Sequence, residues 1–368
     1  MATSATMELI PSSEGHVILD AAAALRPMIR DCQDETERGR RVPSALTEQL
    51  RAAGLYRLLV PRAFGGAEVD LLTYQRAIEL VSEGDGSVGW NLATSNAGAL
   101  TALSLPDAGL QEIFAQGPDV PFAGTLAPVG GRGQAVDGGY VVSGRWAFGS
   151  GCQASEWMIG CFEIFDGAEP RRDAAGSPVR ARGVFKAAEC AIIDTWQVTG
   201  LRGTGSHDWS VSDVFVPSER TAPHPGRITN QWSRWPGTLY QLPGSVFIGP
   251  HFSPVATGIA RAAIDALVAL AGSKTPHTQS ALLREQVQVQ EWVGRADVLL
   301  GSAQAYRATV SSDVWQSVAA GRPVTPEQFA RCRLAASHAA DCAMQATDLM
   351  YRAGGTTSIN WGQQLERC

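Results

Sequence analysis

The period of the apolar residues changes twice along this chain of 368 residues, which restricts the fold more than any other feature. Up to about residue 118, apolar side chains recur at the spacing of amphipathic helices. Short alternating runs broken by glycine clusters follow, from about residue 121 to residue 217, and are typical of strands. Helical spacing returns after a connector rich in proline and tryptophan, 223–250. We therefore predict an α+β fold with an N-terminal helical domain (1–118), a central β domain (119–225) and a C-terminal helical bundle (226–368).

Composition and charge argue against several classes of partner. Hydrophobic residues make up 45% of the chain, the formal net charge is -6 and the pI is near 5.6. No basic field therefore favours nucleic acid or an anionic membrane. No uninterrupted apolar run reaches the roughly 18 residues of a membrane span. The six histidines lack an H-x-x-x-H or H-E-x-x-H spacing, so we expect no metal site.

The seven cysteines are scattered along the chain and include no C-x-x-C pair. An odd number of cysteines without recurrent spacing indicates reduced thiols. We therefore expect a cytoplasmic protein without a disulfide framework.

The segment Gly138–Cys152 joins a tight turn to an alternating strand and then to a serine between two glycines. The Ser150 hydroxyl and the amides of the flanking glycines would then face the edge of a flat ring. Trp146 or Phe148 would form a wall beside that ring. A flat redox cofactor needs such a site, although a plain hairpin ending in a glycine loop also explains these residues.

This segment resembles the flavin-contacting strand of the acyl-CoA dehydrogenase superfamily. More narrowly, it is similar to the flavin-dependent aromatic monooxygenases of that superfamily, which show G-x-W-x-F-x-S-G-C where dehydrogenases carry a W-I-T-N-G type sequence. Six segments match the family in order, and together they cover nearly the whole chain. They are Val60–Gly66, Asp85–Trp90, Phe122–Pro128, Gly144–Cys152, Trp196–Ser206 and Tyr351–Ser358.

The resemblance implies a monooxygenase that hydroxylates a small aromatic or heteroaromatic substrate. Reduced FMN or FAD, held non-covalently and supplied by a separate flavin reductase, would react with O2 to give a C4a-(hydro)peroxyflavin. A homo-oligomer, dimer or tetramer, is implied as well. Two alternatives stay open: an inactive truncated homologue, and an acyl-CoA dehydrogenase, which needs a catalytic carboxylate and a site for CoA. The hydroxylase pattern at Trp146–Cys152 argues against the dehydrogenase.

By the same resemblance, Ser150 is the catalytic residue, because a hydroxyl that accepts a hydrogen bond from flavin N5–H in a dry pocket slows loss of that proton. Arg284 resembles an arginine that reaches the flavin phosphate across a subunit interface, and a solvated helix face is its alternative explanation. A β-turn at Thr125 and a helix C-cap at Gly354 are further alternatives. The predicted cofactor-binding residues are Thr125, Leu126, Pro128, Trp146, Phe148, Ser150, Arg284, Gly354 and Gly355.

The predicted substrate pocket comprises Trp90, Asn96, Trp196, Arg202 and His251. Arg202 lies in a glycine-rich connection whose amides could cradle an anion, although a surface salt bridge would explain this arginine too. His251 and His207 lie near plausible pocket segments, and for both the alternative to a role in the pocket is a structural or exposed histidine.

Two departures from the family pattern concern the catalytic base. Hydroxylases of this branch commonly carry a histidine one or two turns after a Gly-Trp pair, whereas Asn91–Gly98 contains none. The family also continues past an L-x-R-C motif to a downstream histidine, whereas this sequence ends at Leu365–Cys368. We therefore expect weak flavin binding, and more hydrogen peroxide than hydroxylated product.

Overall fold

The computed structural model describes residues 12–224, 232–277 and 279–368, and the side chains of residues 126–128, 245 and 248 lie outside the described part. Part of the predicted connector, 225–231, is likewise outside it. The chain forms two compact units. Unit 1 takes the described residues of Met1–Asp34, Val69–Trp90 and Leu242–Cys368, and unit 2 takes those of Glu35–Glu68 and Asn91–Gln241.

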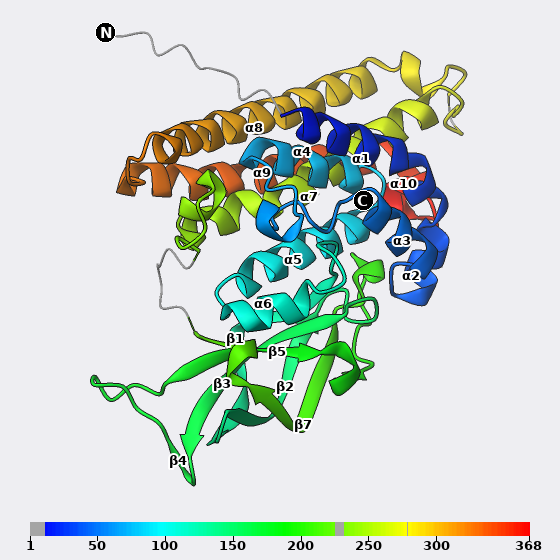
Figure 1. The fold of residues 1–368 in the computed structure, drawn as a ribbon. Coiled ribbons are helices and arrows are strands. Elements are labelled where there is room, and N and C mark those ends of the chain that lie inside the picture. Colours follow the sequence, from blue (N-terminus) through cyan, green and yellow to red (C-terminus); the bar gives the residue numbers. More distant parts are fainter. Residues whose placement is uncertain (1–11, 225–231, 278) are drawn as a thin grey trace. The chain divides into compact units, whose positions relative to one another are not determined.

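Unit 1 is helical, with three long helices of the C-terminal half packed together (Figure 1). Helix α9 contacts both α7 and α8, and α4 contacts α7. The 3-10 turns η6 (Leu283–Glu285) and η7 (Gly355–Ile359) lie between these helices in sequence. The helices are α1 (Ser13–Asp31), α4 (Leu71–Ser82), α7 (Gly244–Ala271), α8 (Val287–Ala319), α9 (Pro326–Gly354) and α10 (Gln364–Arg367).

Side-chain caps define where these helices begin. Asp70 accepts hydrogen bonds from the first backbone amides of α4, and Thr325 forms a capping box with Gln328 at the start of α9. A seam of small residues on α9 lies in the core, which allows α7 and α8 to pack closely against this helix. Its buried members are Ala335, Ala339, Cys342 and Ala346.

One stretch of α7, Gly249–Ala271, is long and apolar enough to cross a membrane by length and composition, with a mean hydropathy of 1.5. The expectation that no such stretch exists therefore needs correction. An uninterrupted apolar run is too strict a criterion, because this helix includes polar residues such as His251 and Thr257. Over half of its apolar window is buried, and its contacts with α4 and α9 explain that composition as a core helix.

Unit 2 contains one sheet of eight strands (Figure 1). Its order is β6-β7-β2-β1-β3-β5-β8, and β4 pairs with β3. Neighbours are antiparallel except for β1 and β3. The strands are β1 (Phe122–Val136), β2 (Gly139–Gly149), β3 (Trp157–Asp166), β4 (Glu169–Pro170), β5 (Arg180–Lys186), β6 (Ala191–Ile193), β7 (His207–Pro217) and β8 (Thr221–Pro223).

Helices of unit 2 flank these strands in sequence. They are α3 (Ser44–Ala52) and α6 (Asp107–Ile113), whereas α2 (Gln33–Gly39) and α5 (Gly86–Ala102) include residues of both units. The predicted tight turn joins β1 to β2, where Val136 pairs with Gly139 and Gly138 has a φ of 78°. A positive φ is accessible to glycine at no steric cost.

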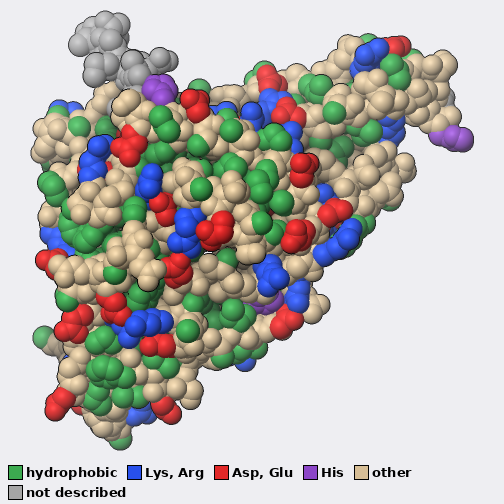
Figure 2. All heavy atoms as spheres, turned by 45° about the vertical axis from the view of Figure 1, so that its right-hand side comes forward, with side chains coloured by type: hydrophobic (Ala, Val, Ile, Leu, Met, Phe, Trp, Pro, Cys, Tyr) green, Lys and Arg blue, Asp and Glu red, His purple; other side chains and the backbone are tan. Residues whose placement is uncertain are grey.

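The described elements follow the predicted order of helices, strands and helices, which confirms the α+β class. The three domain boundaries stay a prediction. Figure 2 shows acidic and basic side chains interspersed over the visible face, in keeping with the small net charge of -6.

Candidate active site

Strand β2 ends in a kinked loop that separates two aromatic side chains. One extra residue of β2 stands opposite β7 between Trp146 and Gly149, and Phe148 takes a left-handed φ of 63°. In a regular strand, residues two apart share a face. The extra residue breaks that alternation, so that Phe148 is 65% exposed whereas Trp146 is 1% exposed.

Trp146 lies in the core of unit 2, which differs from its predicted place beside the cofactor. Its ring stacks on Trp209 with centroids 4.3 Å apart, and its Nε1 donates a hydrogen bond to the Cys161 carbonyl at 2.8 Å. The side chain therefore has no free surface for a ring. Regular alternation would place Trp146 and Phe148 on the same face, and the bulge prevents this.

Three hydroxyl groups meet beneath this loop. Ser150 Oγ lies 2.7 Å from Ser206 Oγ, and Ser206 Oγ lies 2.7 Å from Thr204 Oγ1. Thr204 Oγ1 in turn donates to the Leu201 carbonyl oxygen at 2.9 Å. All three hydroxyl-bearing residues are buried. The glycine-rich connection predicted from the sequence thus lies directly against the Ser150 loop.

Backbone contacts lock the two loops together. Gly151 N–H donates to the Thr204 carbonyl at 2.9 Å, and the Cys152 thiol donates to the Gly205 carbonyl at 3.4 Å. The predicted role of the Gly151 amide as a donor to a ring therefore does not hold, because that hydrogen is used inside the protein. Burial raises the pKa of Cys152 to about 11, so this thiol stays protonated near neutral pH.

An aromatic edge and an irregular stretch of β1 adjoin the Ser150 loop. Phe148 packs edge-on against Trp196, with ring centroids 6.2 Å apart. Thr125 Oγ1 donates to the Ala147 carbonyl, next to Phe148. The pairing of β1 with β3 shifts register between Gly124 and Val129 and again between Val129 and Gly131. The side chains of the other two predicted residues, Leu126 and Pro128, lie outside the described part.

His207 is an anchor that the sequence indicated only weakly. Its Nδ1 accepts hydrogen bonds from the backbone amides of Thr195 and Trp196, both at 3.2 Å. Burial lowers the pKa of His207, against the opposing effect of Asp194, so the ring is neutral at neutral pH. This histidine therefore positions the backbone of Trp196.

The other two substrate-pocket residues of unit 2 have internal partners. Arg202 forms an ion pair with Glu37 at 3.1 Å, with both side chains largely buried. Asn96 is fully buried and donates to the carbonyls of Leu55 and Leu92. Arg202 therefore forms a salt bridge, as its alternative explanation held, although a largely buried one, and Asn96 is engaged inside the protein.

In unit 1, the structure brings the Arg284 turn close to the end of α9. Leu283 N–H donates to the Lys274 carbonyl, and Lys274 Nζ donates to the Gly354 carbonyl at 2.6 Å. Arg284 is exposed and has no ion pair among the described residues. Gly355 follows α9 with a φ of 59° and a ψ of -142°, a backbone conformation that is open to glycine.

The remaining predicted residues of unit 1 belong to an aromatic cluster. His251 is fully buried, and its Nε2 lies 2.8 Å from the Tyr74 hydroxyl. The two rings stack at 4.5 Å, and Phe252 contacts both His251 and Trp90. Burial raises the pKa of Tyr74 well above its ordinary value, so this hydroxyl remains protonated.

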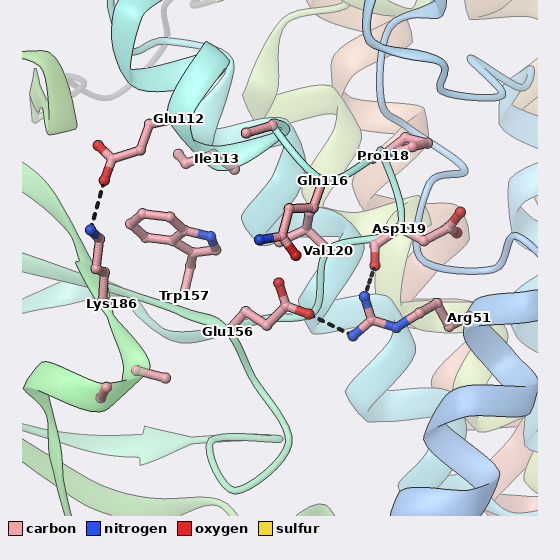
Figure 3. A pocket seen from close by; sticks show the side chains of 14 residues that line it. Arg51, Glu112, Ile113, Gln116, Pro118, Asp119, Val120, Glu156, Trp157 and Lys186 are labelled. Atoms are coloured by element: carbon pink, nitrogen blue, oxygen red, sulfur yellow. Dashed lines mark hydrogen bonds and ion pairs between the residues drawn. The ribbon is translucent and has the colours of Figure 1, made fainter.

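A cavity of about 630 Å³ lies elsewhere in unit 2 (Figure 3). Trp157 lies between two ion pairs, Lys186 with Glu112 at 3.0 Å and Arg51 with Glu156 at 2.6 Å. Lys186 and Arg51, which line the cavity, are therefore already paired with carboxylates. None of the predicted site residues lines this cavity. It is not a candidate for the cofactor.

The hydrogen-bond acceptors around Ser150 fit a reduced flavin. The carboxamide oxygen of Asn91 is buried, without a hydrogen-bond partner among the described residues, and its side chain lies beside Gly151. Buried acceptors match the N–H groups of a reduced flavin ring, and Phe148 offers an apolar contact. Sequence reasoning missed Asn91, Thr204 and Ser206, because only the folded loops bring them to Ser150. No group of three metal-binding side chains occurs among the described residues.

Comparison with known proteins places these features in a family context. Models of the acyl-CoA dehydrogenase N-terminal and C-terminal domains match residues 20–108 and 251–368. The indole-3-acetate monooxygenase of Acinetobacter baumannii is 32% identical over 92% of this chain and 84% of its own. The oxygenase subunit HsaA of a flavin-dependent monooxygenase from Rhodococcus jostii is 29% identical over 94% and 89%. The crystal structure of 3-HSA hydroxylase from Rhodococcus sp. RHA1 aligns with a TM-score of 0.84, at 26% identity over 96% and 89%.

Proposed function

The chain belongs to the acyl-CoA dehydrogenase family and, within it, to the flavin-dependent aromatic monooxygenases, and from this premise we propose that it hydroxylates a small aromatic or heteroaromatic compound. One atom of O2 would replace a ring hydrogen as a hydroxyl group, and the other would leave as water. Bound reduced FMN or FAD would supply the two electrons and two protons that this balance requires.

The Ser150 loop is the observation that supports this proposal most directly. Ser150 Oγ would accept a hydrogen bond from flavin N5–H and so hold that proton in place. The exposed ring of Phe148 would pack against the flavin and exclude water, with Trp196 beside it. The buried oxygen of Asn91 would accept from a second ring N–H.

By the family resemblance, the Arg284 turn of a neighbouring subunit would hold the phosphate end of the flavin. An exposed guanidinium without an ion pair among the described residues suits a phosphate, which binds arginine through paired hydrogen bonds. Gly354 and Gly355 would let the backbone pass close to the cofactor, since neither carries a side chain.

We further propose a homo-oligomer, dimer or tetramer, that works with a flavin reductase in the cytoplasm. Several large apolar side chains of α8 and α9 are exposed, among them Val298, Leu334 and Met344, as expected of a surface that another subunit covers. The HsaA relative is named an oxygenase subunit, which implies a separate reductase for that enzyme. None of the seven cysteines forms a disulfide within the described structure, in keeping with a reducing compartment.

A turnover assay tests the function. The purified chain is given reduced flavin, O2 and a panel of phenols and indoles, and products are analysed by mass spectrometry. We expect a product that has gained one oxygen atom only when reduced flavin is present. Anaerobic reduction of bound flavin by an acyl-CoA thioester, without hydroxylation of any aromatic compound, would instead assign a dehydrogenase.

A further inference from the structure

The three buried hydroxyls beneath the Ser150 loop form a chain with a fixed direction. The chain ends at the Leu201 carbonyl, 2.9 Å from Thr204 Oγ1. A carbonyl oxygen only accepts hydrogen bonds, so the hydroxyl of Thr204 must be the donor there. The Leu201 oxygen also accepts from the Thr204 amide and from Trp196 Nε1, at 3.1 and 3.2 Å, which makes it a firm end point.

The direction then follows from the single hydrogen that each hydroxyl carries. Thr204 uses its hydrogen on Leu201, so its oxygen accepts from Ser206 at 2.7 Å. Ser206 has thereby used its own hydrogen, so its oxygen accepts from Ser150, also at 2.7 Å. The hydrogen of Ser150 therefore points toward Ser206, and only lone pairs of Ser150 Oγ face any other neighbour.

The residue that ends the chain is held in an unfavourable backbone conformation. Leu201 has a φ of 52°, in the left-handed region that costs a non-glycine residue about 1–2 kcal/mol. In this conformation its carbonyl oxygen receives the three donors. The surrounding hydrogen bonds thus over-determine the position of the acceptor on which the direction of the chain depends.

We propose that Thr204 and Ser206 are positioning residues that hold Ser150 as a hydrogen-bond acceptor and so make the site select reduced over oxidised flavin. This inference rests on the proposed function. Reduced flavin carries a hydrogen on N5, which a fixed acceptor stabilises. Oxidised flavin has a lone pair on N5, which would face the lone pairs of Ser150 and be disfavoured.

The test compares the affinities of the oligomeric protein for the two redox states of FMN and needs no turnover. Oxidised FMN is titrated by fluorescence, and reduced FMN is titrated under anaerobic conditions. Thr204→Val keeps the side-chain shape but removes the donor to Leu201. The hydrogen of Ser206 is then free to turn toward Ser150, whose own hydrogen can point outward and donate to the oxidised ring. We expect the ratio of the dissociation constants for oxidised and reduced FMN to fall by about five- to tenfold, as loss of one neutral hydrogen bond predicts.

Three further variants separate positioning from general structural damage. Ser206→Ala removes the acceptor for the Ser150 hydrogen and should lower the same ratio. Thr204→Ser retains the hydroxyl, so the ratio of the two dissociation constants should equal that of the parent. Ser155→Ala, at a nearby hydroxyl that donates to the Cys152 carbonyl and lies outside the chain, should leave the ratio unchanged. A purely structural disturbance would weaken both redox states alike.

Each outcome decides between the claims. If Thr204→Val and Ser206→Ala both keep the preference of the parent for reduced FMN, the positioning role is wrong. The proposed monooxygenase function is not affected by that result. Equal affinity of the parent for both states also overturns it. Failure of the parent to bind FMN or FAD in either state would instead remove the proposed function. Should near-ultraviolet circular dichroism show that Thr204→Val has lost its fold, Ser206→Ala and Thr204→Ser still decide the question.

Discussion

Ser150 does not act as an isolated side chain, because its hydroxyl is one end of a buried chain of hydrogen bonds. The connection between β6 and β7 supplies its hydroxyl partner Ser206 and also Thr204, whose carbonyl accepts from the Gly151 amide. The place of this serine between two glycines could be predicted from its motif. Its partners could not, because Ser206 is 56 residues away in sequence.

Replacement of Ser150 by alanine tests its assigned role. Loss of one hydrogen bond to the cofactor costs roughly 1–3 kcal/mol, so we expect a larger share of the consumed oxygen to appear as hydrogen peroxide. A peroxidase-coupled assay measures that share beside total oxygen consumption. The control Ser155→Ala should behave as the parent does. An unchanged peroxide share in Ser150→Ala would remove this serine from the chemistry.

Arg284 offers a second test at the same scale, since its guanidinium is exposed in the turn before α8. Arg284→Ala should weaken the binding of FMN several-fold, because a charge-assisted contact with phosphate is lost. Riboflavin, which lacks the phosphate, should bind the variant and the parent equally. A parallel loss for both ligands would show that Arg284 acts on the fold and not on the phosphate.

Helix packing in unit 1 depends on close approach at one glycine. A Cβ built at Gly258 of α7 would lie 2.5 Å from Ser82 Cβ and 2.6 Å from the Glu79 carbonyl oxygen of α4. Gly301 of α8 has no atom within 4 Å of the same position. The two glycines therefore suit a paired comparison, because a Cβ at Gly258 would clash with α4 whereas a Cβ at Gly301 would meet no atom.

Alanine at these two positions should change stability in opposite directions. Gly258→Ala forces α4 and α7 apart and should lower the free energy of unfolding by about 1–3 kcal/mol. Gly301→Ala improves helix propensity without a clash and should raise it by about 0.5–1 kcal/mol. Urea denaturation followed by circular dichroism measures both. A destabilisation of equal size at Gly301 would contradict the packing described for α7.

A buried ion pair joins α4 to α8. Glu79 Oε1 lies 3.1 Å from Arg307 Nη2, and it also accepts from Gln304 and Thr257. Burial raises the pKa of Glu79, but Arg307 and the hydrogen bonds outweigh burial, and the net pKa is below its ordinary value. The ionised carboxylate therefore contributes its full stabilisation when the pH is above the ordinary pKa of a glutamate. This stabilisation is lost as the pH falls through the lowered pKa of Glu79 in the folded protein.

Removal of Arg307 should raise the pKa of Glu79 and so change how stability depends on pH. In Arg307→Met the carboxylate of Glu79 loses its main partner, burial then raises its pKa, and we expect about 3–5 kcal/mol less stability at pH 7. The deficit should shrink toward pH 5, where Glu79 takes up a proton. Urea unfolding curves at both pH values give the two differences. A deficit that stays constant would mean that Glu79 does not titrate in this range.

Over the whole molecule, the order of helices and strands could be predicted because hydrophobic period and glycine turns are local signals. Two details could not. The bulge before Gly149 places Trp146 and Phe148 on different faces, and no residue type marks it in advance. The Gly151 amide was expected to face a ligand but donates to Thr204 of a distant loop. Both corrections arise from pairing between strands or loops far apart in sequence.

The central claim is that this chain inserts one atom of molecular oxygen into an aromatic compound while reduced flavin is oxidised. Turnover under isotopically labelled oxygen gas in unlabelled water tests it most directly, with mass spectrometry of the product. We predict that the product carries one labelled oxygen atom and that its formation requires reduced FMN or FAD. An oxygen atom derived from water, or a product formed without reduced flavin, would contradict the claim.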